Sequence, residues 1–375
     1  MKLILCPPFW NKMPPLGLAI LSSIFKNSIV YDLNIEFYHK ASKNLQKKWI
    51  LPETNNIGDL QKEFEERIKQ IAQTPGKNLF GFSMFHSNKP LTLRSAELIK
   101  QINPNAKIIF GGPEIPKRGQ PLLACINKGI KGAVPFCFDA FDLKKYTRHG
   151  FLPILLGQGC VNNCKFCMER LLHEGYYCRG HEIVIKEIES YIEKYNVKNF
   201  IFHDSLINAN LKELGLFCDE VIKRKLPIKW EGQVYINKNM SVDFMRKMKQ
   251  AGCYNIFIGV ESFSDKVLKY FNKGYSSAIA LDFLQKLKQA GLHSELSFIL
   301  GSQIEDEQSF NETLDFIKNN KHVISKIAQV NGLKILPGID LAAQPADVVQ
   351  DRVQRFIKLL EKDGIVFTRE FVNNL

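Results

Sequence analysis

Long apolar runs are missing from the 375-residue sequence, since no stretch approaches the roughly 20 apolar residues that a membrane-spanning helix needs. The opening residues, MKLILCPPFW, lack the charged-then-apolar pattern and the small-residue cleavage site of a secretory leader. Nine cysteines are present, but their odd number and irregular spacing argue against a disulfide framework. Solenoid-type repeats and low-complexity tracts are absent as well. These absences predict a protein of the reducing cytoplasm without membrane spans.

Acidic residues are the scarcer charged class, because 38 Asp and Glu stand against 51 Lys and Arg, a formal net charge of +13. Such an excess favours an anionic partner, such as a phosphorylated cofactor, nucleic acid or an acidic peptide. The lysines are scattered along amphipathic segments such as KNLQKKW and KRKLPIK and form no single block. We therefore expect a solvated basic surface, with nucleic acid as the less favoured partner.

The first part of the chain, residues 1–140, alternates strand-like and helix-like patterns. Strands are expected at 2–6, 29–37, 78–85 and 106–112, with a weaker one at 122–136. Helices are expected at 15–27, 60–73 and 91–102. This alternation predicts an α/β domain of βαβ units, a doubly wound, Rossmann-like parallel sheet.

After an aperiodic connector at 141–150, the alternation resumes with longer helices. Apolar strands are expected at 152–157, 199–205, 228–236, 254–262, 295–301 and 327–335, with amphipathic helices between most of them. Six such units over residues 151–340 predict a partial (β/α)6 barrel with its site at the C-terminal strand ends. The C-terminal region, residues 341–375, is expected to contain a helix followed by a strand-like segment at 365–372.

Three cysteines, Cys160, Cys164 and Cys167, lie within eight residues in the segment LLGQGCVNNCKFCMERL. A structural zinc site generally needs four ligands from two close pairs, and this loop has three thiols. Three thiolates suit three irons of a four-iron cluster and leave the fourth iron open for a substrate or cofactor. The loop follows the first expected barrel strand, and Gly157 and Gly159 allow close backbone approach. Incidental cysteines or a zinc loop are the alternatives.

The spacing CxxxCxxC, with Phe166 before the last cysteine and a β/α repeat after it, resembles the radical S-adenosylmethionine (SAM) enzymes. In that family the open iron is chelated by SAM, whose reductive cleavage gives a 5′-deoxyadenosyl radical. The resemblance implies that Glu261 and Ser262, in FIGVES, hold SAM through its ribose hydroxyls, and that Gly301, in SFILGSQIEDE, packs near adenine. KILPGI, residues 334–339, resembles the turn after the sixth strand.

Other polar residues lie at strand ends where a substrate would bind. His203 and Asp204 follow the second barrel strand, and Asp204 is a candidate catalytic residue or, equally, a helix cap. Gln233 and Tyr235 share one face of the third strand, so both are candidates for the catalytic lumen and Gln233 also for cofactor binding. Core packing is the alternative for Tyr235. The remaining cysteines are expected to be mostly buried, with Cys178 the exception nearest the loop.

The N-terminal domain resembles the cobalamin-binding domain that precedes the barrel in a large subclass of the same superfamily. The segments that carry this resemblance are PPFWNKMPPLGLAILSSIF, DLN, GFSMFHSN and IIFGGPE. It implies that Ser83, Gly111 and Gly112 receive the nucleotide tail of cobalamin. The Asp-x-His-x-x-Gly loop that supplies an imidazole below cobalt is missing after the first strand, so cobalamin is expected to bind without a histidine ligand. His39 and His86 are the alternative ligands.

The resemblance implies a [4Fe–4S] cluster, SAM and cobalamin as cofactors, and methylation of an unactivated carbon as the activity. A non-methylating cyclase or rearrangement enzyme, with the first domain as scaffold, is the main alternative, and an iron–sulfur sensor is another. The short C-terminal region favours a small molecule or short peptide as substrate. An external electron donor, such as flavodoxin or ferredoxin, is the other expected partner. Association with a membrane is not expected.

Overall fold

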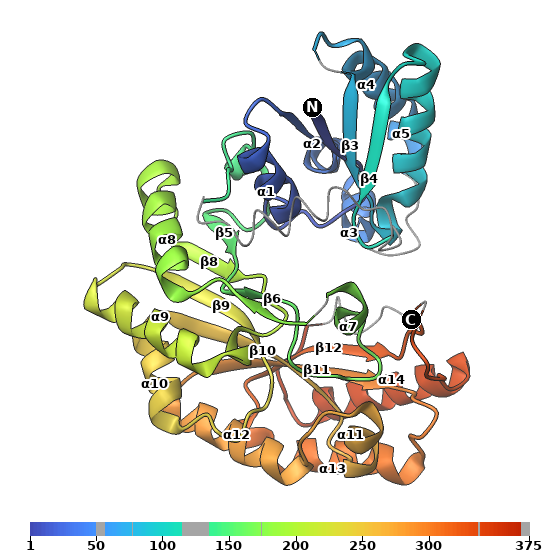
Figure 1. Ribbon diagram of the computed structural model, residues 1–375. Coiled ribbons are helices and arrows are strands. Elements are labelled where there is room, and N and C mark those ends of the chain that lie inside the picture. Colours follow the sequence, from blue (N-terminus) through green and yellow to red (C-terminus); the bar gives the residue numbers. More distant parts are fainter. Residues whose placement is uncertain (50–56, 77, 115–134, 174, 337, 369–375) are drawn as a thin grey trace. The chain divides into compact units, whose positions relative to one another are not determined.

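The computed structural model describes residues 1–49, 57–76, 78–114, 135–173, 175–336 and 338–368 (Figure 1). Internal contacts divide the chain into unit 1, residues 1–153 and 186–197, and unit 2, residues 154–185 and 198–375. These bounds differ from the expected ones, because residues 141–150 belong to unit 1 and the described residues after 340 belong to unit 2. Within the described ranges, no helix has the length and apolar character needed to cross a bilayer.

Unit 1 is built on a parallel four-stranded sheet in the order β2–β1–β3–β4. Its strands are β1 (Lys2–Leu5), β2 (Ile29–Asp32), β3 (Leu79–Ser83) and β4 (Lys107–Gly111). Its helices are α1 (Leu16–Ile24), α2 (Leu33–Lys40), α3 (Lys43–Lys48), α4 (Gln61–Gln73) and α5 (Lys89–Ile102). The strand order reverses at β1, so right-handed crossovers place α1 on one face and α4 and α5 on the other. The doubly wound prediction is confirmed for these strands, and the strand expected at 122–136 lies almost wholly outside the described residues.

The strand expected at 29–37 is wrong in its second half, because β2 ends at Asp32 and α2 begins at Leu33. The Asp32 carboxylate accepts the backbone N–H of Ile35 at 3.1 Å and so caps the helix. Leu33 and Phe37 then fall on one helical face in the core of unit 1. An apolar run of this length fits a strand or a helix equally well, so periodicity alone could not separate them.

A second sheet has six strands in the order β12–β11–β10–β9–β8–β5, and all of them lie in unit 2 except β5, most of which falls in unit 1. The strands are β5 (Phe151–Ile154), β8 (Asn199–Phe202), β9 (Lys229–Val234), β10 (Cys253–Glu261), β11 (His293–Leu300) and β12 (Lys326–Gly332), and the pairs from β8 to β12 are parallel. A short antiparallel pair, β6 (Gly157–Gln158) and β7 (Tyr177–Cys178), flanks the cysteine loop. Sequential order across the sheet is the signature of repeated β/α units, and it confirms the partial barrel.

The helices after β6 lie in unit 2, except α8, most of which falls in unit 1. They are α7 (Glu169–Leu172), α8 (His181–Tyr195), α9 (Leu211–Lys223), α10 (Val242–Gln250), α11 (Asp265–Phe271), α12 (Ser277–Ala290), α13 (Glu307–Asn319) and α14 (Ala346–Lys362). Figure 1 shows α9, α10, α12 and α13 along the outer face of the sheet, where right-handed crossovers place them. Of the strand-like segment 365–372, Phe367 forms one bridge with Ile327, and residues after 368 lie outside the description.

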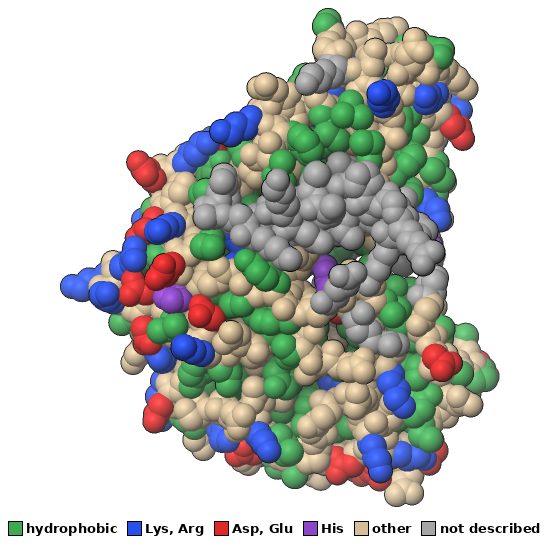
Figure 2. All heavy atoms as spheres, viewed as in Figure 1, with side chains coloured by type: hydrophobic (Ala, Val, Ile, Leu, Met, Phe, Trp, Pro, Cys, Tyr) green, Lys and Arg blue, Asp and Glu red, His purple; other side chains and the backbone are tan. Residues whose placement is uncertain are grey.

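Charged side chains are scattered over the face that Figure 2 shows, among hydrophobic and uncharged polar ones. Figure 2 shows Lys and Arg interspersed with Asp and Glu, as expected for a solvated basic surface. Several of these residues form exposed ion pairs, such as Arg94 with Glu65 and Arg246 with Asp243.

Candidate active site

The three predicted metal ligands lie together on the loop between β6 and α7. Cys160, Cys164 and Cys167 are free, partly buried thiols. Burial raises the pKa of each of them, that of Cys167 to about 11, and at Cys164 and Cys167 the neighbouring thiols contribute in the same direction. Among the described residues, no three His, Cys, Asp or Glu side chains converge as ligands of one metal ion. That finding concerns single ions, whereas the thiolates of a four-iron cluster each bind a different iron.

The cysteine loop is anchored to the end of α11. The Lys165 N–H donates to the Phe271 carbonyl at 3.0 Å, and the Asn272 side chain donates to the Asn163 carbonyl at 2.9 Å. Phe166, the aromatic residue before the third cysteine, packs edge-on against Phe271 with ring centroids 4.9 Å apart. The aromatic position in the motif therefore fixes the loop to the barrel.

Gly159, expected to allow close backbone approach, has a left-handed φ of 82°. A Cβ there would overlap the carbonyl oxygen of Gly175. A side chain at this position would therefore push the cysteine loop away from the segment before β7.

Asp204 holds the backbone immediately before the cysteine loop. Its carboxylate accepts the N–H groups of Leu156 at 3.0 Å and Gly157 at 2.5 Å, and it is buried. Burial raises its pKa to about 7, against the lowering effect of these hydrogen bonds. Arg179 reaches the same segment through the Leu155 carbonyl at 2.9 Å. Asp204 was expected to face the substrate or cap a helix, and here both of its oxygens accept backbone N–H groups of the β5–β6 segment.

Two other candidates near Asp204 are placed differently. The His203 side chain is exposed at the end of β8, and its backbone N–H donates to Ile154 at 2.8 Å. Cys178, in β7, is half-buried, and its thiol donates to the Leu156 carbonyl at 3.7 Å. Both therefore border the segment that carries the cysteine loop.

Glu261 ends β10 in a left-handed conformation with φ of 68°, which is strained for a residue with a side chain. Its buried carboxylate folds back over Gly259, where an added Cβ would overlap Glu261 Oε1. Lys273 Nζ lies 3.3 Å from that oxygen and donates to the Gly259 carbonyl at 2.7 Å. Burial alone would lower the pKa of Lys273, but neighbouring groups, including Glu261 and Cys164, outweigh it and raise the pKa. A buried lysine cation thus stands between Glu261 and the cysteine loop.

Gly301 begins the turn after β11 with φ of 80°. Its N–H donates to Glu305 at 2.6 Å, and the Ser302 hydroxyl beside it is buried without a hydrogen-bond partner. Ser262, predicted to contact SAM, is completely buried and its hydroxyl lies 3.0 Å from that of Thr313 on α13. Its side chain is therefore engaged in the packing of α13.

On the third strand, β9, more exposed side chains alternate with buried ones. Gln233 is exposed, while its neighbour Val234 is buried. Tyr235 is half-buried. Its pKa is raised, mainly by burial and also by the charge of the nearby Cys160 thiolate. The structure thus brings Tyr235 near the cysteine loop. Between β11 and β12, the Ser297 hydroxyl donates to Gln329 Oε1 at 3.5 Å.

In unit 1, the predicted cobalamin residues lie side by side at the C-terminal edge of the sheet. Ser83 ends β3 opposite Gly111, which ends β4. The Met84 N–H donates to the Gly111 carbonyl at 2.7 Å. Gly112 has φ of 107°, and a Cβ there would overlap the backbone of Met84. This edge offers small residues in register, as a nucleotide tail requires.

Aromatic rings occupy the place where a cobalt-binding histidine loop was expected. Phe9, after β1, packs against Phe85, after β3, with centroids 4.3 Å apart, and Trp10 is 47% exposed. The two alternative ligands are engaged elsewhere in unit 1. His39 Nε2 lies 2.6 Å from the carbonyl oxygen of Lys145, and His86 pairs with Glu114 at 3.7 Å.

The sequence did not point to Lys273 or to Arg352, a buried residue of α14 that pairs with Glu305 at 2.7 Å. Lys273 follows α11 without a pattern that marks it. Arg352 could have been suspected, because it interrupts the apolar face of an otherwise amphipathic helix.

Comparison with known proteins bears directly on this site. Residues 154–317, which include the cysteine loop, Glu261 and Gly301, match the Radical SAM superfamily. This match confirms the family resemblance of the barrel.

Curated relatives include an uncharacterized methyltransferase of Pyrococcus horikoshii, 23% identical over 359 residues, which cover 81% of this chain and 73% of that protein. The anaerobic magnesium-protoporphyrin IX monomethyl ester cyclase of Cereibacter sphaeroides is 28% identical over 161 residues, 42% of this chain and 26% of the cyclase. The bacteriochlorophyllide d C-12(1)-methyltransferase of Chlorobaculum tepidum is 27% identical over 201 residues, 50% of this chain and 41% of that enzyme. The chain therefore spans less than half of these last two relatives.

Two solved structures share the fold over most of the chain. The radical SAM methyltransferase TsrM from Kitasatospora setae, solved with tryptophan and a SAM analogue, superposes with a TM-score of 0.64 at 13% identity, covering 88% of this chain and 72% of TsrM. The cobalamin-dependent radical SAM enzyme OxsB, solved with aqua-cobalamin and SAM, gives 0.63 at 16% identity, covering 96% of this chain and 56% of OxsB. The two-domain architecture is therefore a known one.

Proposed function

Because residues 154–317 match the Radical SAM superfamily, we propose that this chain is a cobalamin-dependent radical SAM enzyme that methylates an unactivated carbon of a small polar substrate. The observation that carries the proposal is the cysteine loop, with three partly buried thiols at the C-terminal edge of a partial barrel. Three thiol ligands leave one iron of a four-iron cluster for SAM.

The residues of unit 2 fit a cluster with SAM beside it. Cys160, Cys164 and Cys167 would hold the iron, since their thiols lie close enough to perturb one another. Glu261 and the turn at Gly301 would position SAM, and buried Lys273 would balance the negative charge of Glu261 and the thiolates. When bound, these groups would supply a 5′-deoxyadenosyl radical, and the protein's part is to orient them and exclude water.

The residues of unit 1 fit cobalamin without a histidine ligand. Ser83, Gly111 and Gly112 form a row of small residues where the strand order reverses nearby, the usual ligand edge of a doubly wound sheet. Glu114, the carboxylate near this edge, is paired with Lys89 at 3.4 Å, so a phosphate would not meet an uncompensated anion. Cobalamin would contribute the methyl-carrying capacity.

Methylation is preferred because the P. horikoshii and C. tepidum relatives are named methyltransferases. A cyclase or rearrangement enzyme remains the second candidate, because the C. sphaeroides relative is a cyclase with 28% identity over the compared residues. A sensor without catalysis is disfavoured by the Glu261–Lys273 pair, which adds a charged SAM site to the cluster loop.

The substrate class follows from the polar lining of the barrel. Gln233, Tyr235, Ser297 and Gln329 present amide and hydroxyl groups, which would suit a substrate that forms hydrogen bonds. The electron for SAM cleavage would come from an external donor such as flavodoxin or ferredoxin.

The test is product analysis of the anaerobically reconstituted protein with SAM and a chemical reductant, with and without cobalamin. Cobalamin-dependent S-adenosylhomocysteine together with 5′-deoxyadenosine is expected, and Cys164→Ala should form no 5′-deoxyadenosine. Formation of 5′-deoxyadenosine alone would replace methylation by cyclisation or rearrangement. Failure of the wild-type protein to form either product would contradict an enzymatic function.

A further inference from the structure

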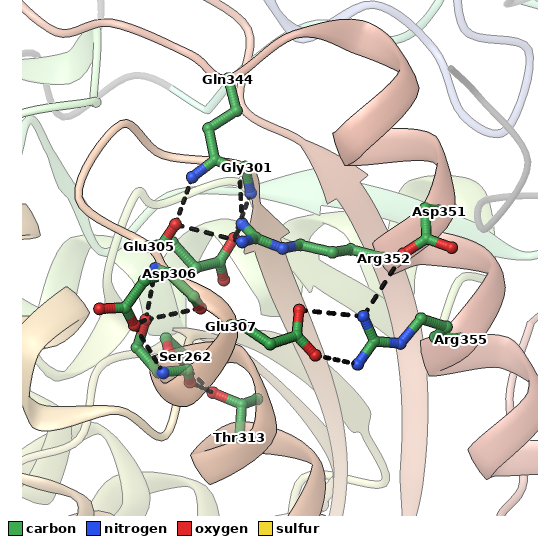
Figure 3. Close-up of polar contacts among 11 residues, drawn as sticks. Ser262, Gly301, Glu305, Asp306, Glu307, Thr313, Gln344, Asp351, Arg352 and Arg355 are labelled. Carbon is green, nitrogen blue, oxygen red and sulfur yellow. Dashed lines mark hydrogen bonds and ion pairs between the residues drawn. The ribbon is translucent and has the colours of Figure 1, made fainter.

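The turn after β11, residues 301–305, is held in place by the C-terminal part of unit 2. Figure 3 shows Arg352 reaching from α14 to Glu305, whose carboxylate in turn receives the N–H of Gly301. Arg352 Nη1 donates to Glu305 Oε2 at 2.7 Å, and Glu305 Oε2 accepts the Gly301 N–H at 2.6 Å. One carboxylate oxygen therefore links the guanidinium of α14 to the backbone of the turn.

Arg352 also fixes the backbone of the turn and a neighbouring side chain. Its Nη2 donates to the Glu305 carbonyl at 3.2 Å, and its Nη1 donates to Gln344 Oε1 at 2.7 Å. The amide of Gln344 donates to the same Glu305 carbonyl. Glu305 is thus held through its side chain and its backbone, which leaves the turn little freedom.

Backbone hydrogen bonds from the segment before α14 also hold the turn at residues 301–305. The Gln344 N–H donates to the Gly301 carbonyl at 2.7 Å, and Gln303 donates to Ala342 at 3.0 Å. Gly301 is also in contact with α14, because a Cβ at this position would overlap Val349. Both ends of the turn are therefore set by residues outside the superfamily match at 154–317.

The buried Arg352–Glu305 ion pair is not explained by a gain in folding stability. The side chains of Arg352 and Glu305 are 6% and 1% exposed, and a buried ion pair is generally no more stabilising than apolar residues of similar volume. Glu305 Oε1 and the Ser302 hydroxyl are buried in the turn without hydrogen-bond partners. Such groups fit a turn shaped for a ligand rather than for maximal stability.

We propose that Arg352 is a positioning residue of the SAM site, which acts through Glu305 to set the conformation of the turn at Gly301. This inference rests on the proposed function, because it takes that turn as part of the SAM site. It makes α14 a structural component of cofactor binding and gives the C-terminal region a role distinct from substrate recognition.

Arg355, one helical turn further along α14, is the matched control. It pairs with Glu307, two residues beyond Glu305, and with Asp351 at 3.4 Å (Figure 3). These side chains are more exposed, at 34% for Arg355 and 60% for Glu307. Arg355→Met therefore removes a charge and two ion pairs from the same helix, and within the described part of the chain Arg355 has no hydrogen bond to residues 301–305.

The experiment measures SAM affinity by anaerobic equilibrium dialysis of the iron-reconstituted protein, alongside iron content and melting temperature. Arg352→Met should weaken SAM binding about tenfold or more, because support of a binding group by its neighbours is commonly worth that much. Arg355→Met should change it less than about twofold. Because Arg352→Met leaves a buried carboxylate unpaired, Glu305→Gln/Arg352→Met provides a charge-neutral second test.

The double variant should recover much of the melting temperature and the full iron content while its SAM affinity stays low. The KM for SAM in 5′-deoxyadenosine formation should rise in both variants far more than kcat falls. Wild-type SAM affinity in either folded variant would overturn the positioning role. Failure of the wild-type and Arg355→Met proteins to bind SAM would instead overturn the proposed function, and the inference with it.

Discussion

Replacing Gly301 by alanine should destabilise unit 2 through two separable effects. The residue has φ of 80°, and an added Cβ would overlap Val349 Cγ2 and lie 3.3 Å from Val349 Cβ. The left-handed conformation costs an alanine about 1–2 kcal/mol, and forced overpacking costs about 1–3 kcal/mol. Gly301→Ala should therefore lower the free energy of unfolding by about 2–5 kcal/mol.

Gly364→Ala is the control for backbone strain alone. Gly364 has φ of 65°, and a Cβ there would meet nothing within 4 Å. Its substitution should cost only the conformational part, about 1–2 kcal/mol. The difference between the two variants measures the contact with α14.

A second-site variant tests the same contact directly. Val349→Ala removes both methyl groups that the new Cβ would meet, and by itself should cost about 2 kcal/mol for the buried surface lost. In the double variant Gly301→Ala/Val349→Ala the overlap with Val349 Cγ2 disappears and only the 3.3 Å approach of the two Cβ atoms is left, so the combined loss should be about 1–3 kcal/mol smaller than the sum. Urea denaturation followed by circular dichroism gives all four corners of this cycle. Strictly additive losses, or a Gly301→Ala protein as stable as the wild type, would refute the reasoning.

Three further predictions follow from other sites. Cys164→Ala should lose the iron–sulfur cluster while the unit 1 sheet stays folded, as iron analysis and circular dichroism would report; a full iron complement would contradict the ligand assignment. Asp204 has a pKa of about 7 in the fold, against an ordinary value of 3.8, and so binds its proton more tightly when folded; its contribution to stability is greatest at low pH and declines as pH rises through 7. The unfolding free energy of the wild type relative to Asp204→Asn should thus fall by about 4 kcal/mol between pH 4 and pH 8, and parallel curves would disprove the shift. Gly112→Ala should destabilise unit 1 by about 2–5 kcal/mol, because φ is 107° and the Cβ would overlap Met84; unchanged thermal unfolding would argue against that contact.

The sequence was sufficient for the elements with strong periodicity. Strands β8 to β12 were expected close to their observed places, with amphipathic helices between most of them, since the alternation of apolar runs and amphipathic helices is determined locally. The short helix α11 was not expected. The end of β2 was missed because the cap formed by Asp32 is a local hydrogen bond that competes with a strand-like apolar run.

The site was predictable where one short motif carries the chemistry and not where distant segments meet. The three cysteines and Glu261 were predicted from short motifs, and the prediction that Tyr235 lines the barrel stays a prediction, with Tyr235 half-buried in the structure. The roles of Asp204, Lys273 and Arg352 depend on contacts across 47, 12 and 47 residues, which no spacing rule encodes. Ser262 was predicted to contact SAM from a short motif, but its hydroxyl is hydrogen-bonded to Thr313 of a later helix, a contact that the motif does not encode.

The most direct test of the central claim is metal analysis after anaerobic reconstitution with iron, sulfide and hydroxocobalamin, followed by desalting and an absorbance spectrum. A [4Fe–4S] enzyme with cobalamin should retain about four irons and one cobalt per chain. Iron without cobalt would contradict the cobalamin assignment and leave unit 1 as a scaffold, and a protein without iron would contradict the account as a whole.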